Sequence, residues 1–224
     1  MTLFLLILLS SLFAITHIGM SHGEIRRSLI QKLGEQPFRG LYSLVSFLTL
    51  GGAIWVFSGH RNLGPLFWDT PGWLYPLVYL LMLLGLMLLV SSFVTPSPTG
   101  MVAKSMTPKG VLRITRHPMN MGFASFGLAH MVANGSLGDL FFFGSIFVVG
   151  FFGAYHQDHR LADERGHGFA AFRTQTSVLP FAAILQGRNH LKPEEFRIPV
   201  LALILAGYVA LVLFHGRLFG AEPF

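Results

Sequence analysis

Six long apolar runs constrain the fold of this chain more than any other feature. They cover approximately Thr2–Met20, Gly40–Ser58, Trp73–Val94, Met119–Val132, Leu137–Tyr155 and Arg197–His215. A helix needs about 20 residues to cross ~30 Å of hydrocarbon, so we expect the short fourth run to gain a turn at each end. The residues are 52% hydrophobic and only 12% charged, which leaves too little polar surface for a water-soluble protein. The sequence predicts an all-α integral membrane protein, a bundle of about six transmembrane helices in a single domain, residues 1–224.

The basic residues predict how this bundle lies in the membrane. The connecting segments 21–39, 95–118 and 156–197 hold 14 of the 16 Lys and Arg residues, namely Arg26, Arg27, Lys32, Arg39, Lys104, Lys109, Arg113, Arg116, Arg160, Arg165, Arg173, Arg188, Lys192 and Arg197. The other side has only Arg61 and Arg217. Basic loops stay in the cytoplasm, so we expect both termini on the non-cytoplasmic side of a bacterial cytoplasmic membrane. This topology accounts for the net charge of +6. We therefore expect the lipid bilayer as the partner of the chain, and no nucleic acid.

Two of the ten histidines fall inside apolar runs. His17 is near the cytoplasmic end of the first run, and His130 ends the stretch TRHPMNMGFASFGLAH, with Phe123, Phe126 and Gly127 on its helix face. This aromatic and glycine-lined face suits a flat, bulky, apolar ligand. An ionisable residue within the membrane indicates a functional site. The alternative is a neutral histidine that hydrogen-bonds a neighbouring helix.

Histidines on two different helices suggest a cofactor. Haem iron accepts two axial ligands and imidazole is a common one, while the absence of cysteine excludes thiolate-ligated haem and iron–sulfur clusters. We therefore expect His17 and His130 to bind haem, with Met20 as an alternative to His17. At ~1.5 Å per residue, His130 lies ~16 Å and His17 ~6 Å below the cytoplasmic boundary. Facing axial ligands need similar depth unless the haem is tilted, so this difference counts against the pair.

Other residues are predicted to support this haem. Two carboxylates in hydrocarbon are very costly, so we expect the propionates to face the basic side, near Arg39, Arg113 or Arg116. Asn134, one turn after His130, is predicted to bond the other ring nitrogen and orient it. His117 precedes His130 by thirteen residues, ~20 Å along one helix with a direction ~140° away, and is expected at the cytoplasmic surface.

Three segments resemble one family over most of the chain. They are THIGMSHGEIRRSLIQKLGEQPFRGLYSLVS, LRITRHPMNMGFASFGLAHMVANG and HQDHRLADERGHGFAAFRTQTSVLPFAAILQGRN. They resemble the NnrU family, which includes membrane proteins linked to denitrification and, as a relative, ζ-carotene isomerase. The resemblance implies haem b with two histidine ligands, one in an H-x-G matched by His17 and Gly19, the other in an L-A-H matched by His130. It implies haem-dependent isomerisation of a lipophilic polyene, or a role in nitrogen-oxide metabolism with a small gaseous substrate.

Two other functions stay open. Arg-His-Pro also resembles membrane methyltransferases of the isoprenylcysteine and phospholipid type, which use S-adenosylmethionine. Those carry R-H-P-x-Y and a downstream acid pair, whereas this chain has Asn120 in place of the tyrosine and Asp158-His159 near the acid pair. We therefore expect no methyl transfer. The third possibility is a non-enzymatic haem or electron carrier, or an assembly factor.

Overall fold

The computed structural model describes residues 1–99 and 106–221, which form helices and loops with no β-strand in that part of the chain. Six helices contain the predicted apolar runs: α1 (Thr2–Ser21), α3 (Glu35–Gly59), α4 (Tyr75–Val94), α6 (Pro118–Ala133), α7 (Leu137–Gln175) and α9 (Ile198–Leu213). The shorter elements are α2 (Gly23–Leu33), η1 (Gly72–Leu74), α5 (Val111–Ile114), α8 (Ala182–Leu185), η2 (Pro193–Glu195) and α10 (His215–Phe219). The predicted all-α membrane fold is confirmed.

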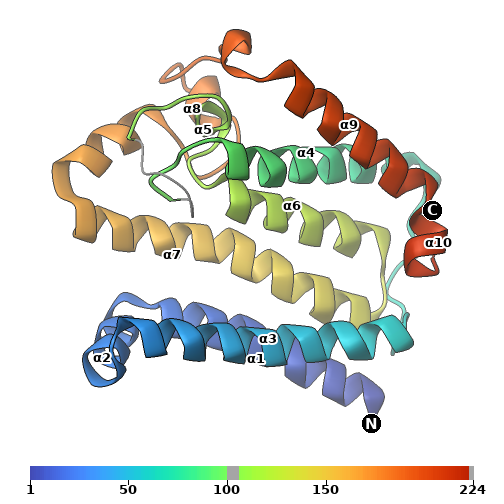
Figure 1. Ribbon diagram of the computed structural model, residues 1–224. Coiled ribbons are helices and arrows are strands. Elements are labelled where there is room, and N and C mark those ends of the chain that lie inside the picture. The colour runs from blue at the N-terminus through green and yellow to red at the C-terminus, as the bar shows by residue number, and fades with distance from the viewer. Residues whose placement is uncertain (100–105, 222–224) are drawn as a thin grey trace.

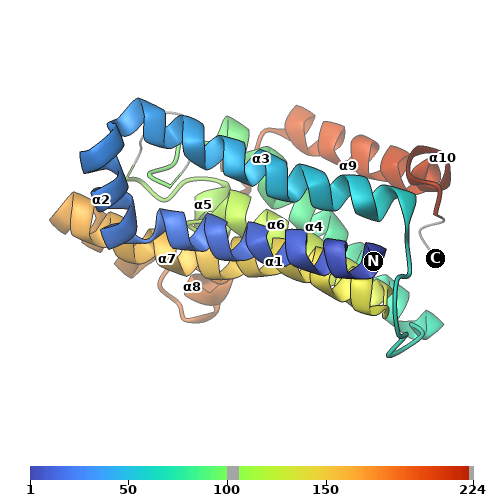
Figure 2. The same cartoon turned by 90° about the horizontal axis from the view of Figure 1, so that it is seen from below.

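The six long helices run side by side and alternate in direction, as Figure 1 shows. The pair α1 and α3 lies at one side, followed by α7, α6, α4 and α9. Seen from below, α3 and α9 lie at the same side of the bundle (Figure 2). Both termini lie at one end, and α2, α5 and α8 lie at the other (Figure 1). The described basic residues of segments 21–39, 95–118 and 156–197 are therefore at one end, as predicted, while Lys104 lies outside the described residues.

Four helices are long and apolar enough to cross a membrane: α1, α3, α4 with the preceding η1, and α7. The helix α9 is apolar but has 16 residues. The helix α6 also has 16 residues and extends the predicted run by one residue at each end, so the expectation of an extra turn at each end is wrong. It lies between α4 and α7 (Figure 1), so much of its surface faces protein and need not match the full bilayer thickness.

Glycines let the helices beside α6 approach closely. A Cβ added to Gly127 would lie 2.7 Å from the carbonyl oxygen of Phe143 on α7, and one added to Gly150 would lie 2.6 Å from that of Asn120. Small residues at such crossings are how membrane helices bring their backbones together. Gly127 therefore packs against α7 and does not line a ligand surface, which corrects its predicted role.

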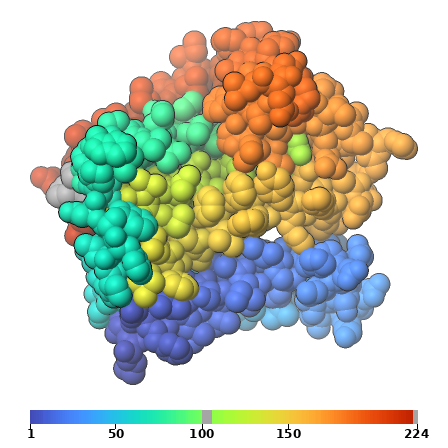
Figure 3. Space-filling view, turned by 180° about the vertical axis from the view of Figure 1, so that it is seen from behind, coloured from blue at the N-terminus to red at the C-terminus, as the bar shows by residue number. Residues whose placement is uncertain are grey.

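The segment expected to be a long cytoplasmic loop is partly helical. The helix α7 continues past Tyr155 to Gln175 and bends at Gly166, where φ is +55°. The chain then returns to the start of α6, where Arg116 N–H donates to the Ser177 carbonyl at 2.9 Å and Phe181 N–H donates to that of Ile114 at 2.8 Å. From behind, this returning segment (orange) and the segment before α4 (teal) form separate bulges on the surface (Figure 3).

Candidate functional site

His17 lies between α1 and α3, in the half of the bundle next to α2. Its Nδ1 is 3.1 Å from Ser46 Oγ on α3, and its half-buried ring packs on Phe13 and Tyr42 with centroids 5.3 and 4.8 Å away. The Tyr42 hydroxyl donates to the His17 carbonyl at 3.3 Å. These contacts fix the ring through Nδ1.

His130 lies near the opposite end of the bundle, in the last turn of α6. Its Nδ1 donates to the Phe126 carbonyl at 3.0 Å, and its ring packs on Phe126 and on Phe143 of α7 at 4.2 and 4.5 Å. This aromatic group continues to Phe57 of α3, which contacts Phe143 edge-on at 5.2 Å. The predicted aromatic surroundings of His130 are present, and most come from other helices.

The depth of each histidine in the bundle can be compared through the residue of α7 that lies level with it. On its α1 side, Leu6 lies against Gly138 and His22 against His156. Interpolation between these contacts puts His17 level with about residue 150, whereas His130 is level with Phe143. The difference is about seven residues, or roughly 10 Å along the helix. The structure reproduces the depth difference that the sequence predicts, and as they lie the two rings do not face each other.

The donor chemistry of each histidine nevertheless suits a haem ligand. In both rings Nδ1 is hydrogen-bonded, and within the described residues no hydrogen bond reaches Nε2 of either. In metal-ligating histidines the nitrogen bonded to the protein carries the proton and the other keeps its lone pair. The Phe126 carbonyl can only accept and so favours this form of His130, and Ser46 Oγ allows it for His17 when it accepts from Nδ1. Either histidine could then hold a haem iron.

The predicted partner of the His130 ring is wrong. Asn134 follows the last residue of α6. Its Nδ2 donates to the backbone carbonyl of His130 at 2.9 Å. Its side chain therefore caps the helix, because the last carbonyls of a helix lack intrahelical donors. The Phe126 carbonyl holds the ring instead.

The three arginines expected near the propionates differ in availability. Arg113 forms a two-pronged ion pair with Glu195 at 2.7 and 2.8 Å and also donates to Asn189 at 2.8 Å. The hydrogen bonds from Arg113 hold the pKa of Glu195 at about 2. Arg39 is exposed on α3, and its one ion pair with a described residue is that with Glu35, at 2.7 Å. Of these two, Arg39 is the one available to a new carboxylate.

Arg116 belongs to a buried cluster centred on Asp158 of α7, in the part of α7 beyond its apolar run. Its guanidinium donates to both carboxylate oxygens at 2.5 and 2.9 Å, His117 Nε2 lies 3.0 Å from the same carboxylate, and Arg173 lies 3.1 Å away. Burial disfavours the carboxylate, but the bonds from His117 and Arg116 outweigh it and hold the pKa of Asp158 far below its ordinary value. His117 is 1% exposed, so its predicted surface position is wrong.

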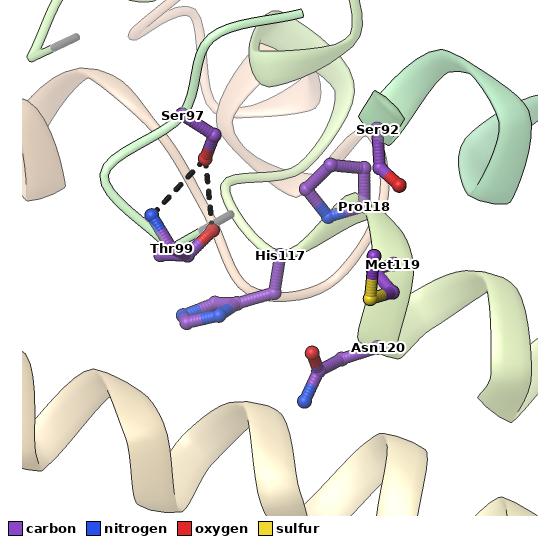
Figure 4. A pocket seen from close by; sticks show the side chains of 7 residues that line it. All are labelled: Ser92, Ser97, Thr99, His117, Pro118, Met119 and Asn120. Carbon is purple, nitrogen blue, oxygen red and sulfur yellow. Dashed lines mark hydrogen bonds between the residues drawn. The ribbon is translucent and has the colours of Figure 1, made fainter. Parts of the chain in front are cut away.

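A small cavity adjoins His117. Its volume is about 10 Å³, and its lining comprises Ser92, Ser97, Thr99, His117, Pro118, Met119 and Asn120 (Figure 4). This space is near the minimum for a single water molecule and does not admit S-adenosylmethionine. In the part of the chain that the structure describes, the Arg-His-Pro sequence supplies two partners for Asp158.

Sequence reasoning missed the role of Asp158. The signal was present, because a lone acid beside an apolar run and an Arg-His pair at another run's boundary are complementary charges. Within the described residues, no group of three or more His, Cys, Asp or Glu side chains is arranged to hold a metal ion.

Comparison with known proteins links these sites to a family. A family model described as NnrU protein matches residues 5–223. A relative named 15-cis-zeta-carotene isomerase, chloroplastic, from Zea mays is 30% identical over 209 residues, covering 89% of this chain and 57% of the relative. The protein of the same name from Arabidopsis thaliana is 32% identical over 235 residues, covering 96% and 61%. The chain thus spans about three-fifths of the length of these relatives. No solved structure matches.

Proposed function

This chain belongs to the NnrU family, and we propose that it is a haem b protein that isomerises a carbon–carbon double bond in a lipophilic polyene within the membrane. The names of the relatives support the isomerase role. The observation that carries the haem assignment is the bare Nε2 on each of the two half-buried histidines, His17 and His130. Neither Nε2 is among the fully buried unpartnered atoms of the described residues, so each is open to a ligand. In hydrocarbon a polar atom without a hydrogen-bond partner is costly, and ligation of iron would remove that cost.

The haem and the protein would have different roles in this reaction. Cis–trans isomerisation adds and removes no atoms, so it needs a surface that orients the polyene and a group that eases rotation about one bond. Bound haem would supply a redox-active iron. The protein would supply His17 and His130 as ligands, held by Ser46 Oγ and the Phe126 carbonyl, and an apolar approach from the lipid.

The apolar approach is visible on α3 and α6. Phe47 and Trp55 on α3 are 74% and 75% exposed, and Phe123 on α6 is 44% exposed. In a membrane these rings face acyl chains, which are chemically similar to a polyene. A substrate dissolved in the bilayer can therefore reach the protein without crossing water.

The experiment has a spectroscopic and a catalytic stage. Protein purified in mild detergent from haem-replete cells should show a Soret band and a haem b pyridine haemochrome spectrum. In liposomes containing a 15-cis polyene, the reduced protein should produce the trans isomer, resolved by chromatography, while the double variant His17→Ala/His130→Ala should not. If the protein were colourless but monodisperse, both histidines would be residues that only stabilise contacts between helices.

Other outcomes identify the alternatives. Haem binding without isomerisation would favour a carrier or a role in nitrogen-oxide metabolism. Saturable binding of S-adenosylmethionine that is lost on changing Arg116 or His117 would favour a methyltransferase. The location in a bacterial cytoplasmic membrane stays a prediction, since both relatives are named as chloroplast proteins.

A further inference from the structure

We propose that His22 and His156 form a binding site for a divalent transition-metal ion, separate from the haem site. His22 lies at the junction of α1 and α2, and His156 lies on α7 at the same end of the bundle. Their ring centroids are 5.0 Å apart and their planes meet at 34°. Two distant segments of the chain thus bring two imidazoles together at the cytoplasmic end.

One ring nitrogen at this site lacks a partner. His156 Nε2 is buried and has no hydrogen-bond partner among the described residues. Most buried side-chain polar atoms are satisfied, so this nitrogen needs an explanation. An imidazole nitrogen without a partner can give its lone pair to a metal ion, and imidazole is a common metal ligand.

The separation of the rings fits a shared ion. Imidazole nitrogens bind zinc at ~2.0–2.1 Å, and two imidazoles on one tetrahedral ion place their centroids about 5 Å apart. The measured 5.0 Å agrees with this value. Imidazole ligands suit zinc, copper and nickel, and in general the softer first-row ions over magnesium or calcium.

Two of the neighbouring arginines have other contacts, whereas Arg27 Nη1 lies 3.6 Å from the position of a Cβ at Gly23, next to His22. Arg160, one turn beyond His156, lies 3.5 Å from Glu164, and Arg26 lies over the Phe38 ring at 5.6 Å from its centroid. The exposed Glu24 follows His22 by two residues, but it does not complete a three-residue metal group in the described part of the chain. The site therefore offers two protein ligands and leaves positions for water or an anion.

A bound ion would link the junction of α1 and α2 to α7. This junction follows His17 by five residues, yet the site uses neither His17 nor His130. The proposal is consequently independent of haem, and its test does not depend on the colour or activity of the protein.

Cobalt(II) titration tests the site, because a tetrahedral cobalt centre has intense visible absorption bands. Metal-stripped, tag-free protein in detergent should develop these bands with saturable, one-to-one binding, and zinc should displace the cobalt. His22→Ala, at an exposed position, and His156→Gln should each weaken binding at least tenfold. His190→Ala, at another exposed cytoplasmic histidine, should bind as wild type. The proposal would be overturned if cobalt did not bind saturably to the wild-type protein, or if both site variants bound it with wild-type affinity. The two rings would then form an ordinary ring contact.

Discussion

The histidine just before α6 and the histidine in its last turn have opposite surroundings. His117 is 1% exposed, and both its ring nitrogens have partners, Asp158 at 3.0 Å and Gln157 at 3.2 Å. His130 is half-buried, and among the described residues a partner is found for its Nδ1 alone. Complete hydrogen bonding marks the histidine that holds the fold, and an unused lone pair marks the one that can bind a ligand.

Burial alone would give the wrong answer for this pair. The more deeply buried His117 is a structural residue, since it joins Arg116 and Arg173 around a single carboxylate. Leaving a buried polar atom unsatisfied costs about 1–3 kcal/mol, so loss of the His117 ring should destabilise the fold. His130 Nε2 is not among the buried unpartnered atoms of the described residues and is open to a ligand, so the two regions should respond differently to substitution.

The largest effect on stability is expected from Asp158→Asn. The substitution keeps the shape but removes the charge that faces Arg116 and Arg173, and breaking a buried ion pair costs about 3–5 kcal/mol. Unfolding of the purified protein in mixed micelles, followed by circular dichroism, should show this loss. The control is Asp163→Asn, at an exposed position on the same helix, which should unfold as wild type. Equal stability of the two variants would contradict the structural role of the cluster.

The largest effect on haem is expected from His130→Ala. This variant loses an axial ligand whose surroundings, Phe126 and Phe143, offer no replacement, so stable haem binding should be abolished. His117→Ala should keep the wild-type Soret band and lose about 1–3 kcal/mol of unfolding free energy instead. A bleached His117→Ala beside an unchanged His130→Ala would reverse the assignment.

A smaller spectral change is expected from His17→Ala. His130 remains to hold the iron in this variant, so we expect a five-coordinate or altered haem with a shifted Soret band. Met20→Leu is the matched comparison, because Met20 lies one turn further along α1 as the alternative ligand. Should Met20→Leu shift the band and His17→Ala leave it unchanged, the second ligand is the thioether.

The sequence predicts features that depend on composition along the chain. All six apolar runs are helices, and the basic residues gather at one end because membrane insertion sorts them by charge. The depth of His17 and of His130 also follows from position alone, at ~1.5 Å per residue. These properties need no knowledge of which helices are neighbours.

Features that depend on helix neighbours could not be predicted. Gly127 looked like a ligand surface because its own helix does not reveal that α7 lies against it. Arg113 and Arg116 looked like free cations because their partners, Glu195 and Asp158, are far away in sequence. Pairing over such distances is set by how the bundle packs, which one helix's periodicity does not encode.

The smallest effect is expected from Arg39→Gln, and it isolates the propionate prediction. Arg113 and Arg116 cannot test it cleanly, since changing either breaks an existing ion pair. Arg39 and Glu35 have side chains 61% and 54% exposed, so their pair contributes about 0–1 kcal/mol and its loss should barely change unfolding. Arg39 precedes Ser46, the hydrogen-bond partner of His17, by two turns of α3, or about 10 Å. It therefore lies between the His17–Ser46 contact and the end of the bundle that holds α2. A propionate bound to Arg39 should make the haem midpoint potential of Arg39→Gln differ from that of Glu35→Gln, which breaks the same surface pair but leaves the cation. Wild-type potentials in both variants would place the propionates elsewhere.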